Sequence, residues 1–388
     1  MFSEIVGSIE FQMSFLLFVA LAGYLLASRI NQSAVVGEIL VGLLIGPSLL
    51  GWITYTEFVE SVAHLGAIIL LFVVGLEFRL KDIFHLKYGV IALMGAVVPW
   101  IAGFYLTKAF GYDLSSSIFV GTAMTATSIA ITANVLKEMG KLQTAAAKAI
   151  IGAAVIDDVL SLLALSLTKQ LVTGTLSLSS TSLIVLKAVG FLVIGSYIGS
   201  RFFARAIAKV DESKIARTYP EFAFIFAMAT AFLYSMVAEI LGLSAILGSF
   251  IAGVSIGSVV LQHSKNYREG AEYLHIIFAS IFFISLGILA DVKALSSGLL
   301  LFLLLLTVAA VLTKVIGCSI PARLQGMKTK ESLIVGFGMS PRGEMAMVIS
   351  LIGLKQGIIG QEIYVTLVFM SLLTTILTPI ILRNWLYK

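Results

Sequence analysis

Apolar runs of about twenty residues recur along the chain, and short polar segments separate them. Such a run is long enough to cross the hydrocarbon core of a bilayer as a helix. The pattern predicts thirteen spans, numbered 1 to 13 in chain order, near residues 11–29, 33–51, 60–78, 86–108, 116–136, 143–168, 181–206, 220–240, 243–261, 274–290, 297–322, 330–353 and 360–384. We therefore expect an all-α, multi-pass protein of the cell membrane.

Composition supports a membrane protein and excludes other classes. Of the 388 residues, 59% are hydrophobic and 12% charged, and the mean hydropathy is +1.05. The net charge of +5 does not indicate nucleic-acid binding, because the basic residues lie in short loops between spans. The single Cys318 excludes an intrachain disulfide, and no Cys/His cluster suggests a structural metal. No long polar segment follows span 13, so we expect no soluble regulatory domain.

The distribution of basic residues predicts the orientation of the chain. The loops after odd-numbered spans, together with the C-terminal end, hold 18 Lys and Arg residues, whereas the opposite side holds Lys108, Lys169, Lys293 and Lys355. Cytoplasmic loops carry the excess of basic residues. This predicts a cytoplasmic C-terminus and an external N-terminus.

Four basic residues lie inside the expected spans. Lys148 and Lys187 lie toward span ends, where a long side chain can extend to the membrane surface. Lys314 and Arg342 lie deeper, and each requires a partner in the low-dielectric interior.

An internal repeat relates the two halves of the chain. The segment SAVVGEILVGLLIG from Ser33 matches SAILGSFIAGVSIG from Ser244 at six of fourteen positions. The offset of 211 becomes 212 for Gly75 and Gly287, which is difficult to attribute to chance similarity between Gly- and Ala-rich helices.

The repeat also predicts the topology. Span 2 corresponds to span 9, and a displacement by seven spans, an odd number, means that the copies cross the membrane in opposite directions. This inverted arrangement is typical of secondary transporters. We expect a first repeat at 1–176, a connecting span at 177–212 and a second repeat at 213–388.

Inverted repeats predict a pair of discontinuous helices. Span 5 carries Thr125, Thr127 and Ser128 at its middle, and span 12 carries Pro341 within GFGMSPRGE from Gly336. Pro341 removes a backbone donor and frees carbonyl groups. Freed carbonyls at membrane depth are expected to line a cavity, although a simple proline kink is the alternative.

Two adjacent aspartates, Asp157 and Asp158, lie in the apolar run GAAVIDDVLSLLALSL of span 6. Each costs roughly 3 kcal/mol at a helix centre, so their default interpretation is an ion or proton pathway. Neighbours on a helix point about 100° apart, so one should face a protein cation and the other an aqueous cavity. Lys314 of the other repeat is the expected counter-charge. A static buried ion pair is the alternative, but it leaves one aspartate without a role.

The chain resembles the monovalent cation:proton antiporter-2 (CPA2) family, in its sodium/proton exchanger branch. The segments that carry the resemblance are VGEILVGLLIGPSLLG from Val36, LLFVVGLEF from Leu70, TAMTATSIAIT from Thr122, GAAVIDDVL from Gly152, FFISLG from Phe282, KVIG from Lys314 and SPRGEMAMVI from Ser340. Each segment is weak evidence alone, but their joint spacing over almost the whole chain is very specific.

The resemblance implies particular roles for the charged residues. It pairs Asp157 with Lys314 and makes Asp158 the principal carrier of the cation and the proton, with Thr127 and Ser128 close to the bound ion. It also implies a moving core of spans 4 to 6 and 11 to 13 and a dimer-forming scaffold of spans 1 to 3 and 8 to 10.

Four further charged residues have less certain roles. Arg342 and Glu344 are expected to stabilise the helix crossing through ion pairs, in a structural charge network that could also include Glu77. Glu77 lies at the cytoplasmic end of span 3, where an interfacial carboxylate is ordinary, and Glu38 is similarly ambiguous.

These observations predict an antiporter, without a cofactor, that exchanges Na⁺, or else Li⁺ or K⁺, for H⁺ by alternating access, and the resemblance implies that it is a homodimer. Two carboxylates and a lysine predict electrogenic exchange. K⁺/H⁺ exchange is the alternative. In this family it is sometimes found together with a cytosolic nucleotide-binding domain, and because we expect no such domain here, this alternative is weaker. A cation channel requires a pore-lining loop, which we do not find. The four histidines supply no H-E-x-x-H pattern of an intramembrane enzyme.

Overall fold

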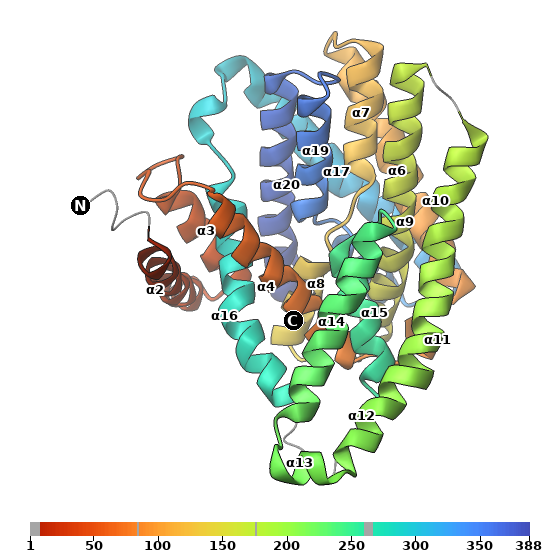
Figure 1. Ribbon diagram of the computed structural model, residues 1–388. Coiled ribbons are helices and arrows are strands. Elements are labelled where there is room, and N and C mark those ends of the chain that lie inside the picture. Colours follow the sequence, from red (N-terminus) through yellow and green to blue (C-terminus); the bar gives the residue numbers. More distant parts are fainter. Residues whose placement is uncertain (1–7, 84, 175–176, 260–266) are drawn as a thin grey trace. The chain divides into compact units, whose positions relative to one another are not determined.

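The computed structural model describes residues 8–83, 85–174, 177–259 and 267–388 (Figure 1). In this part of the chain all regular structure is helical, which confirms the expected all-α class. The first half contains α2 (Ile9–Arg29), α3 (Ala34–Ile45), α4 (Glu57–Leu76), α5 (Leu80–Ile83), α6 (Leu86–Ala109), α7 (Leu114–Thr125), α8 (Ile129–Glu138) and α9 (Ala145–Thr173).

The remaining helices begin with a long composite helix and end at the C-terminus. The composite helix consists of α10 (Leu178–Gly190), η1 (Phe191–Gly195), α11 (Ser196–Ile198), η2 (Gly199–Phe203) and α12 (Ala204–Asp211), where η1 and η2 are π-helical. It is followed by α13 (Lys214–Thr218), α14 (Phe222–Ile240), α15 (Ala245–Ile256), α16 (Tyr267–Ile288), η3 (Val292–Ala294), α17 (Ser297–Leu324), α18 (Thr329–Gly338), α19 (Gly343–Lys355), α20 (Gln361–Ile381) and η4 (Leu382–Leu386).

Within the described residues, ten helical segments are long and apolar enough to cross a membrane. They coincide with ten of the thirteen expected spans, and the α7–α8 pair is one of them. The other three expected spans are spans 2, 9 and 12. Span 12 is present as the broken pair α18 and α19, which agrees with the predicted discontinuity at Pro341.

Spans 2 and 9 are shorter than the sequence predicts. Instead of residues 33–51, span 2 is helical only over the 12 residues of α3, and span 9 only over the 12 residues of α15. A 12-residue helix is about 18 Å long, which is less than the hydrocarbon core. Pro47 disfavours helical backbone at Gly46, so the apolar residues after α3 form turns instead. The last two residues expected in span 9 lie outside the described residues.

The two short helices match each other closely, as the sequence repeat predicts. Each begins directly after a serine with extended backbone, Ser33 in one case and Ser244 in the other, and each contains 12 residues. Small residues also allow other helices to pack closely against α3.

In α16, Gly287 faces the backbone of α3 so closely that an added Cβ atom would overlap the carbonyl oxygen of Ile39. Small residues at such crossings are typical of helix packing in membranes.

The chain divides into two compact units, and each draws segments from both sequence repeats. The first unit contains residues 1–60, 85–178 and 283–388, and the second contains 61–84 and 179–282. In the first unit, α6 packs against α17, α7 and α9, and α20 packs against α19 and α17 (Figure 1). In the second unit, α14 packs against α15 and α12.

Candidate ion-binding site

The two aspartates lie in the middle of α9, a 29-residue helix of the first unit. Thr144 caps the N-terminus of this helix by accepting a hydrogen bond from the Ala147 amide, and Gly174 ends it with a left-handed backbone conformation. Asp157 is 0% exposed and Asp158 is 8% exposed. The helix therefore holds two carboxylates in the interior of the unit, where each requires compensation.

The two broken helices meet opposite these aspartates. Helix α7 ends at Thr125 and α8 begins at Ile129, while α18 ends at Gly338 and α19 begins at Gly343. The two connecting segments contact each other directly, because the Ser128 amide donates to the Pro341 carbonyl at 2.8 Å. The predicted paired discontinuity is present, and each break leaves helix-end carbonyl groups that need donors.

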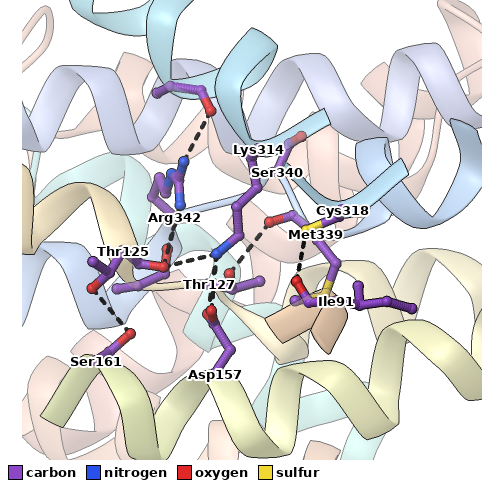
Figure 2. Close-up of polar contacts among 12 residues, drawn as sticks. Ile91, Thr125, Thr127, Asp157, Ser161, Lys314, Cys318, Met339, Ser340 and Arg342 are labelled. Carbon is purple, nitrogen blue, oxygen red and sulfur yellow. Dashed lines mark hydrogen bonds and ion pairs between the residues drawn. The ribbon is translucent and has the colours of Figure 1, made fainter. Parts of the chain in front are cut away.

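Lys314 of α17 pairs with a carboxylate and also donates a hydrogen bond to a carbonyl group at the end of α7. Its Nζ atom lies 3.1 Å from Asp157 Oδ1 and 3.2 Å from Oδ2, and it donates to the Thr125 carbonyl at 2.8 Å. Figure 2 shows the lysine extending between the aspartate and the end of α7. Both charged side chains are fully buried. This is the residue with which the sequence analysis pairs Asp157.

Arg342 donates hydrogen bonds to a carbonyl group at the end of α7 and to another in α17. Its Nη1 atom donates to the Ala126 carbonyl at 2.8 Å, and its Nη2 atom donates to the Ala310 carbonyl of α17 at 2.9 Å (Figure 2). We expected an ion pair, but the hydrogen bonds described for this fully buried guanidinium go to backbone oxygens. A half-helix C-terminus carries partial negative charge, which explains why a cation is stable there.

Glu344 lies in the first turn of α19, where the helix dipole favours an anion. Its Oε2 atom accepts a hydrogen bond from Ser128 Oγ at 2.6 Å. Its described partner is thus a hydroxyl group and not the cation that we expected. Because Ser128 precedes α8, the contact joins the N-terminal ends of the two half-helices α8 and α19.

Hydroxyl groups satisfy the carbonyl groups at the end of α18. Thr132 Oγ1 donates to the Gly338 carbonyl at 2.6 Å, and Thr127 Oγ1 donates to the Met339 carbonyl at 3.3 Å. These bonds come from α8 and the segment before it. The crossing is therefore held by bonds between the two sequence repeats.

Asp158 differs from its neighbour in its bonding. Its Oδ2 atom is buried and has no hydrogen-bond partner among the described residues. A buried carboxylate oxygen without a donor is costly unless a ligand or a proton occupies it. No cluster of three or more His, Cys, Asp or Glu residues that could hold a metal occurs in the described part of the chain. The arrangement provides one available carboxylate beside a second that is already paired.

Glu77 and Glu38 are the remaining two candidates. Glu77 belongs to the second unit, where it lies 3.5 Å from Arg268, and both side chains are partly exposed. Glu38 is buried in α3, beside Gly23 of α2. Neither residue is in a described contact with Asp157 or Asp158.

The structure adds groups to the site that the sequence analysis did not assign to it. Thr125 accepts from Lys314 through its backbone and donates to Ser161 Oγ at 3.2 Å through its side chain. Ser161 follows Asp157 by one helical turn, so its spacing was a usable signal. The carbonyl groups of Ala126 and Ala310 carry no signal in the sequence, because every residue has a carbonyl.

We expect Gly343→Ala to destabilise the protein more than Gly357→Ala. Gly343 has φ of +47°, and an added Cβ atom would lie 2.6 Å from Ser128 Cβ. Gly357 has φ of +68° with open space around it, so it is the matched control for backbone strain alone. That strain costs about 1–2 kcal/mol in either variant, and the overlap adds to it only at Gly343. Thermal unfolding in detergent measures the difference, and equal midpoints would contradict close packing at the crossing.

The chain is similar to known proteins over most of its length. The family model for the transmembrane part of sodium/hydrogen exchangers matches residues 16–388. The chain is 31% identical to the Na(+)/H(+)-K(+) antiporter GerN of Bacillus cereus, with 92% of this chain and 91% of that protein aligned. It is 33% identical to a Na(+)/H(+) antiporter of Enterococcus hirae, with 94% of each aligned.

The fold is also similar to a solved structure. The sodium proton antiporter MjNhaP1 of Methanocaldococcus jannaschii superposes with a TM-score of 0.73 at 17% identity, covering 97% of this chain and 96% of that one. At this identity the similarity shows a shared fold. With the family match over nearly the full length, it follows that the chain is a membrane protein of the sodium/hydrogen exchanger family.

Proposed function

We propose that this protein exchanges Na⁺ for H⁺ across a membrane, and that Asp158 carries the two ions alternately. The observation that carries the proposal is the buried Oδ2 atom of Asp158, which has no partner among the described residues. A carboxylate oxygen is a ligand suited to a hard cation, and a proton can occupy the same atom. The relatives named as Na(+)/H(+) antiporters support Na⁺ as the cation.

Competition for this carboxylate gives a simple mechanism of alternating access. Charged Asp158 is costly in a low-dielectric interior, whereas a bound Na⁺ or proton neutralises it. Only the neutralised site would then pass easily between the two membrane faces. Thr127 and Ser128, beside the breaks, are the hydroxyl groups that we propose to approach the cation. Uptake of one ion requires release of the other, which couples the two fluxes.

We propose that Asp157 and Lys314 make the exchange electrogenic. In the described state they form an ion pair, with Nζ 3.1 Å from Oδ1. If this pair takes up a proton from one side of the membrane and releases it to the other in each cycle, the protein moves more positive charge as protons than as cations. An elementary charge moved across 100 mV is worth about 2.3 kcal/mol, so the membrane potential would help to drive exchange.

Potassium transport is the second candidate activity. The name of the Bacillus cereus relative includes K⁺ as well as Na⁺, and that protein is 31% identical over most of both chains. Competition at a single carboxylate also allows more than one monovalent cation. Na⁺ nevertheless remains the better-supported cation, because it is named for all the relatives described here.

The proposed assembly follows the sequence analysis. We propose a CPA2-type homodimer in the cell membrane, with the N-terminus outside and the C-terminus in the cytoplasm, in accordance with the excess of basic residues after odd spans. Inverted repeats at 1–176 and 213–388 would flank the connecting span at 177–212.

The activity can be tested with purified protein in proteoliposomes. An imposed pH gradient should dissipate when Na⁺ is added, at a rate that saturates with Na⁺ concentration. Choline is the control, because it cannot enter a carboxylate site sized for a small ion. Li⁺ and K⁺ in parallel measure selectivity. Cation flux that needs no proton counter-flow would indicate a channel and overturn the proposal.

We expect Asp157→Asn to change the voltage dependence of exchange. The amide keeps the size of the carboxyl group but cannot exchange a proton with Lys314. The variant should retain part of the Na⁺/H⁺ exchange while losing its response to an imposed potential. The measurement is the exchange rate at several K⁺/valinomycin potentials. Wild-type exchange that is indifferent to potential would make the transport electroneutral and limit Asp157 to a structural role.

A further inference from the structure

An apolar groove lies in the second compact unit and is lined by none of the residues proposed to bind ions. It is lined by residues of the composite helix from α10 to η2 and of α14 and its C-cap, and its volume is about 390 Å³. Its lining is apolar apart from Lys187 and the hydroxyl-bearing Tyr234. Exposed apolar side chains surround it, including Leu186 and Ile194. In a helix that crosses a membrane, such a surface faces acyl chains and not water.

The backbone of the composite helix creates the groove. The π-helical segment η1 (Phe191–Gly195) interrupts the α-helical bonding between α10 and α11. Two glycines of the groove, Gly190 and Gly195, leave space where side chains would otherwise project. Tyr234 Oη of α14 donates to the Gly195 carbonyl at 2.7 Å, which fixes the spacing of the two helices at this level. This bond joins the two sides of the groove.

Lys187 provides charge at one end of this apolar surface. It lies two to three turns from the start of α10 and is only partly exposed. A lysine inside a membrane span is costly unless its ammonium group reaches the headgroup region or pairs with an anion. A basic side chain beside a groove between membrane helices is suited to a lipid headgroup phosphate. Charge and shape thus indicate the same class of occupant.

We propose that this groove binds an anionic phospholipid, with one acyl chain beside Gly190 and the headgroup phosphate near Lys187. The apolar lining accounts for binding of the chain, and the lysine accounts for preference among headgroups. The site would be independent of ion exchange, because it involves none of the residues assigned to the ion site.

The test uses delipidated full-length protein with phosphatidylglycerol or phosphatidylcholine, and native mass spectrometry to count bound lipids. Gly190 has helical backbone, and an added Cβ atom would meet no atom within 4 Å, so Gly190→Leu should fill the groove without disturbing the fold. The matched control is Gly298→Leu in α17, which is also helical and open but lies outside the groove. Lys187→Gln tests the headgroup, and Lys355→Gln, at an exposed lysine, is its control.

Wild type should retain phosphatidylglycerol in preference to phosphatidylcholine. Gly190→Leu should lose one bound lipid of either kind, whereas Gly298→Leu should not. Lys187→Gln should lower the preference for phosphatidylglycerol about fivefold, the contribution of one lysine at an anionic membrane surface. Unchanged lipid counts in Gly190→Leu would overturn the proposal. So would a change of oligomeric state without lipid loss in that variant, since the groove would then bind a second copy of the chain.

Discussion

Asp158→Asn is expected to reduce Na⁺-dependent proton flux to the level of protein-free vesicles. The amide has nearly the size of the carboxyl group, so the packing of α9 should be preserved. It carries no negative charge, however, and cannot bind a proton and a cation alternately. The measurement is dissipation of an imposed pH gradient in proteoliposomes.

The control for this variant is Asp291→Asn, which removes a carboxylate that lies after the end of α16, in the segment before η3. Asp291 caps η3 by accepting from the Lys293 amide, and asparagine can accept the same bond. Its flux should match that of wild type, and both variants should elute from size exclusion as wild type does. Substantial Na⁺-coupled flux from Asp158→Asn would mean that another group carries the ions.

Lys314→Ala is expected to give the largest loss of stability among the variants considered. Its ammonium group serves both Asp157 and the Thr125 carbonyl, and all three groups are buried. Removing one partner of a buried pair leaves an uncompensated charge, which typically costs about 3–5 kcal/mol. The midpoint of thermal unfolding in detergent should fall well below that of Lys355→Ala, at an exposed position of α19.

A double variant separates the lost charge pair from the lost packing. Asp157→Asn removes the charge that Lys314→Ala leaves unpaired, so the combination should be more stable than Lys314→Ala alone. Recovery should be partial, because the Thr125 carbonyl still lacks its donor. If the two effects on stability simply add, Asp157 and Lys314 do not interact in the folded protein.

The helix pattern could be predicted because it depends on local properties of the chain. Ten of the expected spans coincide with long apolar helical segments, one of which is the broken pair α7–α8. The serines before α3 and α15 mark matching helix starts in the two repeats. The prediction was wrong about the length of these two helices. Hydropathy measures apolar character and does not distinguish a helix from the apolar turns that follow Gly46, so it extended span 2 to residue 51.

The sequence also indicated which residues require partners, because a charged residue in an apolar run is costly in any fold of this class. That argument singled out Asp157, Asp158, Lys314 and Arg342. It could not specify the bonds of Arg342, since the carbonyl groups of Ala126 and Ala310 are invisible in a pattern of side chains. Which backbone carbonyl groups accept such bonds depends on where a helix ends, as at Ala126, and on which helix packs nearby, as for Ala310.

The sequence by itself thus determined the class of the protein, its repeats and the location of its buried charges. The resemblance implies that Asp157 pairs with Lys314, but only the tertiary structure shows the contact itself and an oxygen of Asp158 without a partner among the described residues. The two residues are adjacent and chemically identical, so no local property distinguishes them. Their difference arises from the positions of α17 and of the crossing half-helices, which are set by packing between segments far apart in the chain.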